Sequence, residues 1–336
     1  MRRSDDTIIA ITGGAGYVGS QCAAALAPRG YRVVVIDRDE AVSRRTFADS
    51  RITVRAGDLR DPAFAAGAIE GAALILHCAA RIGASTYMRD FQADILADNA
   101  LIDAALYPAA VAAGKPAVVY ASSSMVFQHA PVFPYREEDL IRTPPPTNVY
   151  GFSKLSGEYF CRAFGTQYGL PYVIIRYHNI YGPGERGKGE GAGNVHVIPA
   201  FIAKVLSGQY PLELLSVGGT RPFSYIDDTV EATCRVVERA LARDKQVLAN
   251  DFNIGPNEAT SILDLAALIW EECGDGRPFQ YVVKNDLGNL TAVRREMDAG
   301  KTERIIGWKS KVDLKTGIRQ TAAWMRENGT PSARCS

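Results

Sequence analysis

The chain has 336 residues, of which 47% are hydrophobic and 22% are charged, with 38 basic and 37 acidic residues. This composition is that of a folded globular protein, and the length allows one large domain with a smaller appended lobe. Because the net charge is only +1 and both signs are mixed along the chain, the sequence predicts no surface for nucleic acid or for an anionic membrane.

The cysteines and the N-terminus bear on the compartment. The six cysteines lie far apart without a CxxC pair, which argues against a disulfide framework and a structural zinc site. The apolar run after the charged residues 1–6 breaks at Gly13, so it is too short for a signal sequence or a membrane span. The four histidines have no metal-ligand spacing, so no metal is expected. We therefore expect a cytoplasmic protein.

Apolar runs of strand length alternate with segments of helical period in the first half. Strands are predicted at 7–12, 31–37, 52–56, 73–77 and 117–122, and helices at 17–28, 62–69, 91–113 and 149–168. This alternation predicts an α/β fold of the Rossmann type, a doubly wound parallel sheet with helices on both faces. The helices 91–113 and 149–168 are longer than a crossover needs, so a subunit contact is a further possible role.

The second half is less regular. A strand is predicted at 171–177, a glycine-rich loop at 182–193, helices at 198–206, 227–241, 262–272 and 314–328, and a short strand at 251–254. We interpret residues 178–336 as mainly a smaller C-terminal α+β lobe, from which some segments return to the domain formed by residues 1–177.

A glycine motif follows the first strand. The sequence TGGAGYVG at 12–19 opens the first helix, with Gly13, Gly16 and Gly19 in GxxGxxG spacing. Glycine there permits a tight turn and lets the backbone approach a pyrophosphate at the helix N-terminus. Asp37 closes the second strand eighteen residues past Gly19, which completes the dinucleotide-binding fingerprint.

Asp37 also bears on the choice of dinucleotide. A carboxylate at this position accepts hydrogen bonds from the ribose hydroxyls and repels a 2′-phosphate, which favours NAD over NADP. An arginine can accommodate that phosphate, so the adjacent Arg38 allows the opposite preference, although a solvated surface arginine is the simpler interpretation.

The sequence YGFSK at 150–154 places Tyr150 and Lys154 on one face of the fourth predicted helix, since residues four apart are neighbours on a helix. A YxxxK match alone carries little information. Its position after the strand 117–122, whose end carries three consecutive serines at 122–124, is informative because open α/β sheets bind ligands at the carboxyl ends of their strands.

Taken together, the chain resembles the extended short-chain dehydrogenase/reductases of the NAD-dependent epimerase/dehydratase family. Seven motifs occur in the family's order: TGGAGYVG at 12–19, GDLRD at 57–61, HCAA at 77–80, SSSMVF at 122–127, YGFSK at 150–154, RYHNIYGP at 176–183 and TRPFSYIDD at 220–228.

The resemblance implies the catalytic residues Ser123, Tyr150 and Lys154. Tyr150, as a phenolate, would take a proton from a sugar hydroxyl that Ser123 holds, while Lys154 would lower the phenol pKa and bind the cofactor ribose. A free phenol has a pKa near 10, so a tyrosine that acts as a base near neutrality needs its phenolate stabilised over its phenol by about 4 kcal/mol. We prefer Ser123 to its two neighbours because the family's catalytic hydroxyl lies three residues before the position of Val126.

The resemblance also assigns the binding residues. For NAD they are Gly13, Gly16, Tyr17, Val18, Gly19, Asp37, Arg38, Asp58, Leu59, Ala79, Ala80, Asn99, Ala121, Tyr150, Lys154 and Tyr177. For the nucleoside diphosphate sugar they are Ser123, Ser124, Asn179, Val195, Arg221, Arg294 and Arg295. Arginine suits a diphosphate because its planar fork of donors matches phosphate oxygens; for Arg294 and Arg295 a surface salt bridge is an equally good interpretation.

The residue between Ser124 and Val126 narrows the expected reaction. The eliminating, decarboxylating and 3,5-epimerising relatives carry an acidic residue or a cysteine there, whereas this chain has Met125, which cannot transfer a proton. We therefore expect epimerisation, most plausibly at C4 of a hexose. A dehydratase, a decarboxylase, a ketosugar reductase and a non-catalytic NAD(P)-sensing regulator are the alternatives, and family precedent implies a homodimer through the two long helices.

Overall fold

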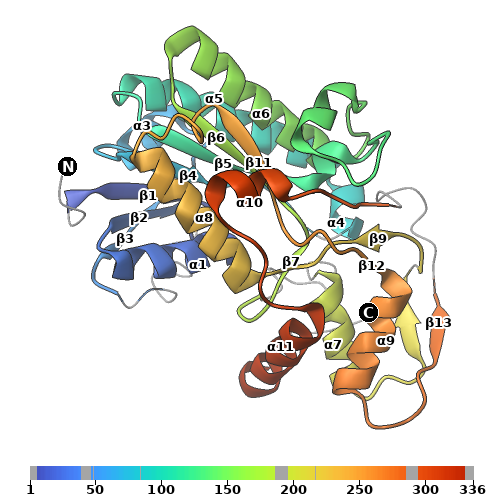
Figure 1. Cartoon of the computed structure of the whole chain (residues 1–336). Helices are drawn as coiled ribbons and strands as arrows, with labels where there is room; N and C mark the ends of the chain where they lie inside the picture. Colours follow the sequence, from blue (N-terminus) through green and yellow to red (C-terminus); the bar gives the residue numbers. More distant parts are fainter. Residues whose placement is uncertain are drawn as a thin grey trace.

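A seven-stranded parallel sheet lies at the centre of the structure, with its strands in the order β11-β6-β5-β4-β1-β2-β3 (Figure 1). The computed structural model describes residues 6–38, 47, 49–83, 85–185, 196–215, 217–284 and 294–329. The strands of the sheet are β1 (Ile8–Thr12), β2 (Arg32–Asp37), β3 (Ile52–Ala56), β4 (Leu74–His77), β5 (Ala117–Ser123), β6 (Tyr172–Tyr177) and β11 (Asn250–Ile254). Each agrees with its predicted bounds to within one residue, and the order is that of the expected Rossmann-like fold.

Helices cover both faces of the sheet, because successive residues of a strand point in opposite directions. Ile9 and Ile11 belong to the core under α1 (Tyr17–Leu26) and α8 (Ile226–Leu241). Ala10, between them, belongs to the core on the other face. That face is covered by α3 (Pro62–Ala68), α5 (Gln92–Ala112) and α6 (Val149–Tyr168).

The short strand predicted at 251–254 is the edge strand β11 of the main sheet, whereas the sequence interpretation grouped it with the smaller lobe. It pairs in parallel with β6, and its residues Phe252 and Ile254 are fully buried. Strand length and apolar character do not encode which sheet a segment joins, so this assignment required the tertiary structure. The second half of the chain therefore returns to the N-terminal domain.

The smaller lobe packs three helices beside short strands. The helices are α7 (Val197–Leu206), α9 (Ile262–Cys273) and α11 (Leu314–Asn328). Three two-stranded pairs accompany the main sheet: β7 (Ile180–Tyr181) with β10 (Ser224–Tyr225), β8 (Leu212–Leu214) with β13 (Tyr281–Val283), and β9 (Thr220–Arg221) with β12 (Thr260–Ser261). These pairs were not predicted, nor were α4 (Ser85–Asp90), α10 (Gly300–Ile306) and the 3-10 turns η2 (Ala27–Arg29), η3 (Ser124–Phe127) and η4 (Glu137–Arg142).

Helix α5 is long and apolar enough to cross a membrane by length and composition, yet half of its apolar window is buried inside the protein. It packs against α3 and α6, as expected for a core helix.

The topology also sets where a ligand can bind. Strands β1 and β4 are neighbours, and the chain runs outward from them in opposite directions to β2 and β5. Such a reversal leaves a crevice at the carboxyl ends of the two strands, which is where open α/β sheets bind their ligands. The glycine motif and the three serines lie at this edge.

Candidate active site

The turn between β1 and α1 depends on glycine at two positions. Gly13 has φ of 64°, and a Cβ there would lie 2.7 Å from the Cα of Ala79. A Cβ on Gly19 would lie 2.6 Å from the carbonyl oxygen of Gly13. Both distances are shorter than any normal contact, so a side chain at Gly13 would push the turn away from the end of β4, and one at Gly19 would clash within the turn itself. Glycine keeps the crevice narrow and its backbone accessible.

The first turn of α1 offers free backbone donors. Its N-cap is Gly16, whose missing side chain cannot cap the helix, and no acidic residue lies in the first turn, which begins with Tyr17 and Val18. The N–H groups and the positive end of the helix dipole therefore point into the crevice. This cradle fits the pyrophosphate of a dinucleotide.

Asp37 ends β2 beside this turn. Its Oδ2 accepts a hydrogen bond from the backbone N–H of Ala15 at 3.0 Å, and its Oδ1 accepts one from the N–H of Arg38 at 2.8 Å. The carboxylate thus holds the glycine turn in place and remains half-buried at the end of the strand, while the Arg38 side chain is exposed. Its part in ribose recognition remains a prediction.

Two further predicted cofactor residues have protein partners. The Arg60 guanidinium pairs with Asp58 at 2.5 Å and holds the pKa of that carboxyl at about 2. The Asn99 side chain accepts a hydrogen bond from the N–H of Arg81 at 2.6 Å and donates to its carbonyl at 3.2 Å. Asn99 therefore fixes the loop after β4. The others lie at, or within three residues of, the carboxyl ends of β3, β4, β5 and β6: Leu59, Ala79, Ala80, Ala121 and Tyr177.

The structure brings Ser123, Tyr150 and Lys154 together. Asn148 caps α6 by accepting the N–H of Gly151 at 3.1 Å, so the helix begins next to Tyr150, whose hydroxyl lies close enough to the Ser123 side chain for Ser123 to lower its pKa. The Lys154 ammonium donates to the Ala121 carbonyl at 2.7 Å and lies 5.9 Å from the centre of the Tyr150 ring.

Without a bound ligand, the surroundings of Tyr150 and Lys154 favour the neutral form of each side chain. Burial raises the pKa of Tyr150, and the hydrogen bond from Ser123 only partly opposes that effect. Burial likewise lowers the pKa of Lys154, and the carboxylate of Asp103 opposes it. Deprotonation of the phenol near neutrality would therefore require further positive charge close to Tyr150.

Met125 and Tyr150 are buried in one apolar cluster with Ile95. The Met125 N–H donates to the Ser123 Oγ at 3.2 Å. Ser124, between Ser123 and Met125, is buried at the start of η3. The cluster that contains Tyr150 thus includes a thioether, which has no transferable proton.

One of the three predicted arginines is buried, and a second lies half-buried near it. Arg295 is 5% exposed, its Nε has no hydrogen-bond partner, and within the described part of the chain it forms no ion pair. Burial and the charge of Arg295 lower the pKa of Arg221 to about 9. Arg294, by contrast, is exposed and pairs with Glu296 at 2.7 Å. Arg295 therefore presents a buried charge that an anion would neutralise.

The remaining predicted substrate residues are less informative. Asn179 is half-buried after β6, and its amide donates to the carbonyl of Pro222 at 2.9 Å. Val195 lies outside the described residues. No group of three or more His, Cys, Asp or Glu residues suited to a metal ion occurs among the residues that the structure describes.

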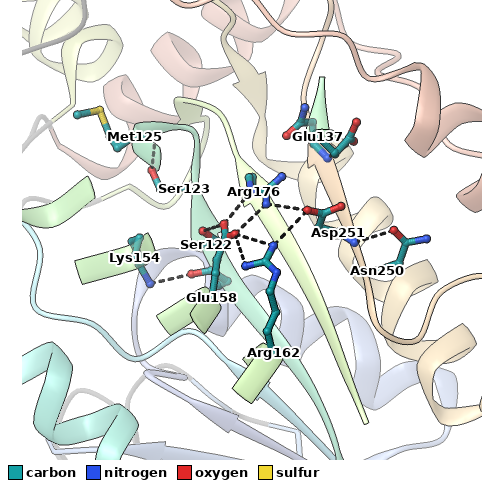
Figure 2. A network of polar contacts seen from close by, with 12 residues as sticks. Ser122, Ser123, Met125, Glu137, Lys154, Glu158, Arg162, Arg176, Asn250 and Asp251 are labelled. Atoms are coloured by element: carbon teal, nitrogen blue, oxygen red, sulfur yellow. Dashed lines mark hydrogen bonds and ion pairs between the residues drawn. The ribbon is translucent and has the colours of Figure 1, made fainter. Parts of the chain in front are cut away.

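Sequence reasoning missed two buried polar networks beside the site. His77 links Thr12 at 2.7 Å to Asp103 at 2.9 Å, which joins the ends of β1 and β4 to α5. A second network centres on Glu158 and Arg176, both fully buried (Figure 2). Glu158 lies four residues after Lys154, and this continuation of the YxxxK spacing is the one signal that could have indicated it.

Comparisons with known proteins agree with this geometry. The sequence profile of the NAD dependent epimerase/dehydratase family matches residues 9–255. The chain is 30% identical over 326 residues to a Methanocaldococcus jannaschii protein named "Putative UDP-glucose 4-epimerase", which covers 96% of this chain and 99% of that protein. It is 28% identical to a dTDP-4-dehydro-6-deoxy-D-allose reductase of Streptomyces, covering 95% of this chain and 96% of the reductase. The structure of Thermus thermophilus UDP-glucose 4-epimerase in complex with NAD matches with a TM-score of 0.79 at 26% identity, over 96% of this chain and 100% of that one.

Proposed function

Because this chain belongs to the NAD dependent epimerase/dehydratase family, we propose that it inverts C4 of a nucleoside diphosphate hexose, with NAD as its cofactor. The curated relatives include both epimerases and a reductase, so the reaction must be argued from the residues of the site.

The crevice fits NAD. The glycine turn and the open first turn of α1 suit the pyrophosphate, Asp37 suits the adenosine ribose, and Lys154 suits the other ribose. When bound, NAD supplies the reversible exchange of a hydride with a sugar carbon and a positive charge near the phenol. That charge adds to the ammonium of Lys154, and the two together lower the Tyr150 pKa against the effect of burial.

The protein's own groups then handle the proton. Tyr150 takes the proton of the C4 hydroxyl and returns it after the keto sugar has turned its other face. Ser123 keeps the reacting oxygen on the phenol by a hydrogen bond. General acid–base transfer of this kind contributes about a hundred- to ten-thousandfold to the rate.

The observation that carries the proposal is the place of Met125 in the buried apolar cluster that contains Tyr150. Elimination of water and 3,5-epimerisation need a second group that moves a proton on the sugar, and the thioether cannot be that group. With Tyr150 as the one acid or base that we assign among the described residues, the keto sugar has one simple fate, which is reduction back to an alcohol. The reaction is therefore redox-neutral and reversible.

Arg221 and Arg295 support the class of substrate. The buried guanidinium of Arg295 lowers the pKa of the nearby Arg221, so positive charge gathers where an anion would stabilise it, and a diphosphate has the right charge and spacing of oxygens. We infer that the diphosphate of the nucleotide sugar lies between them.

The test is incubation of the purified protein with UDP-, GDP-, CDP- and dTDP-hexoses, followed by NMR of the products. We expect one C4 epimer pair, no net NADH, and full retention of deuterium placed at C4. A ketosugar reductase would consume NADH stoichiometrically, a dehydratase or decarboxylase would give a product lighter by water or carbon dioxide, and a sensing protein would convert none of the sugars.

A pair of tyrosine variants isolates the chemical step. Tyr150→Phe should lose about a hundred- to ten-thousandfold in kcat while still binding NAD, because the ribose and pyrophosphate contacts come from other residues. Tyr159→Phe is the matched control, since Tyr159 lies on the same helix and is 65% exposed, and it should retain full activity. Equal activity of the two variants would contradict the assignment of Tyr150.

A further inference from the structure

Glu158 continues the catalytic face of α6 without reaching the reacting groups. It lies one turn after Lys154 and is fully buried, and its Oε1 accepts the hydroxyl of Ser122 at 2.7 Å. Lys154, earlier on the same face, holds the carbonyl just before Ser122. Two side chains spaced four residues apart on α6 thus hold two consecutive residues of β5, and Tyr150, one turn before Lys154, lies beside Ser123, the next residue of the strand.

The other bonds of Glu158 fix its position rigidly (Figure 2). Arg176 of β6 donates from Nε and Nη2 to the two carboxylate oxygens, both at 2.7 Å. Arg162, one turn further along α6, donates to Oε2 at 3.1 Å. Both oxygens of Glu158 are therefore occupied, so the carboxylate has no capacity to accept a proton in catalysis.

The same cluster reaches the second half of the chain. Arg176 also donates to Asp251 of β11 at 2.7 Å, and Lys301 of α10 donates to the other oxygen of Asp251 at 2.8 Å. Figure 2 shows the chain of dashed contacts that runs from Ser122 of β5 through Glu158 and Arg176 to Asp251. The catalytic helix is thereby joined to β5, β6 and β11 at one point.

Such a cluster acts on geometry more than on stability. Removing two charges from water costs about as much as their attraction returns, so a buried ion pair adds little net free energy of folding. Each member must nevertheless meet its partners at hydrogen-bond distance. The cluster therefore restricts how α6 can slide or rotate over the end of β5, where the contact between Tyr150 and Ser123 is made.

We propose that Glu158 is a positioning residue of the catalytic machinery: by holding Ser122 of β5 to α6, it aligns the hydroxyls of Ser123 and Tyr150 for proton transfer. The inference rests on the proposed roles of Ser123 and Tyr150. It adds a residue that touches neither substrate nor cofactor and acts through the strand.

The sharpest test is Ser122→Ala, which removes one buried hydroxyl and changes no charge. We expect kcat to fall by about ten- to a hundredfold, since misplacement of reacting groups by about 1 Å has effects of this size. KM for the sugar nucleotide and the Kd for NAD should stay unchanged. The acid limb of the pH profile of kcat/KM should move to higher pH, because the hydrogen bond from Ser123 is what opposes the rise of the Tyr150 pKa.

Two companion variants complete the experiment. Glu158→Gln should give the larger loss of kcat, because it also weakens the bonds to Arg176. Thr302→Val is the control: it removes a buried hydroxyl bond to the Asn253 carbonyl of 2.7 Å away from α6, and it should leave kcat and the pH profile unchanged. If Glu158→Gln does not fold, Ser122→Ala alone decides.

A crystal structure of Ser122→Ala with NAD shows the relative position of Tyr150 and Ser123 directly. It needs no substrate, so it tests the inference even if no nucleotide sugar is converted. We expect the distance between the hydroxyls of Tyr150 and Ser123 to be longer than in the wild-type complex. The inference is overturned if that distance is unchanged, or if kcat is that of the wild type. It is also overturned if Ser122→Ala loses thermal stability, NAD affinity and kcat together, since that pattern indicates a purely structural role.

Discussion

Replacement of Arg295 by methionine separates what this residue does for folding from what it does for binding. Only 5% of Arg295 is exposed, and within the described part of the chain no carboxylate neutralises its charge. An uncompensated buried charge destabilises the folded protein, and methionine has a similar length without the charge. We expect Arg295→Met to be more stable than the wild type by about 2 kcal/mol, the middle of the range found when buried charges are replaced by apolar residues.

The same change should weaken ligand binding. Loss of a buried, charge-assisted contact to a phosphate group costs about 3 kcal/mol, which corresponds to roughly a hundredfold in Kd. Calorimetry with UDP, GDP, CDP and dTDP would measure this loss for whichever diphosphate the wild type binds, and thermal unfolding without ligand would measure the gain in stability.

Arg294→Met is the matched control, because the neighbouring arginine is exposed and already pairs with Glu296. It should change stability by less than about 0.5 kcal/mol and leave diphosphate affinity intact. The reasoning fails if Arg295→Met unfolds at a lower temperature than the wild type, or if the two variants bind the diphosphate equally well.

Three further predictions concern other parts of the molecule. NAD should bind far more tightly than NADP, and Asp37→Asn, which keeps an acceptor for the Ala15 N–H, should narrow that preference by about tenfold in titrations of the two cofactors. Burial alone would raise the pKa of Asp251, but Arg176 and Lys301 hold it at about 2, below its ordinary value of 3.8. Asp251 therefore adds about 2 kcal/mol to the free energy of unfolding above pH 4, and this stabilisation is lost as the pH falls through 2. Asp251→Asn should flatten this part of the acid-unfolding curve. We also expect a homodimer through α5 and α6, where Leu101 and Tyr159 are 51% and 65% exposed; Tyr159→Glu should yield monomers in light scattering, and a monomeric wild type at micromolar concentration would contradict the assembly.

Local patterns in the sequence predicted those features that depend on residues close together in the chain. The glycine turn requires Gly13 and Gly19 within one strand-to-helix connection, and the spacing of Tyr150 and Lys154 lies within one helix. The glycine turn could be recognised because its spacing lies within one strand-to-helix connection, although the approach that requires Gly13 is to Ala79 at the end of β4. The pair Tyr150 and Lys154 could be recognised because both lie on one helix face.

Features that depend on packing between distant segments were not predictable in the same way. Arg294 and Arg295 are adjacent in an extended segment, where neighbours point in opposite directions, and only the packed structure shows that Arg295 faces inward. Likewise, the sequence gives Glu158 as a helical residue of unknown role, because its partners Arg176 and Asp251 lie on two different strands. The strand at 251–254 was recognised, but its place in the main sheet was not.

The edge strand β11 has a consequence for how the chain can be divided. Because β11 pairs along the whole of β6, a fragment ending at residue 177 would expose an unpaired row of backbone donors and acceptors on a buried, apolar strand. Open edges of this kind recruit other chains and promote aggregation. During synthesis the first six strands must therefore wait, with that edge unprotected, until the ribosome has released residue 254. The second half of the sequence, supplied in trans as a separate polypeptide, would find its docking site already formed on β6.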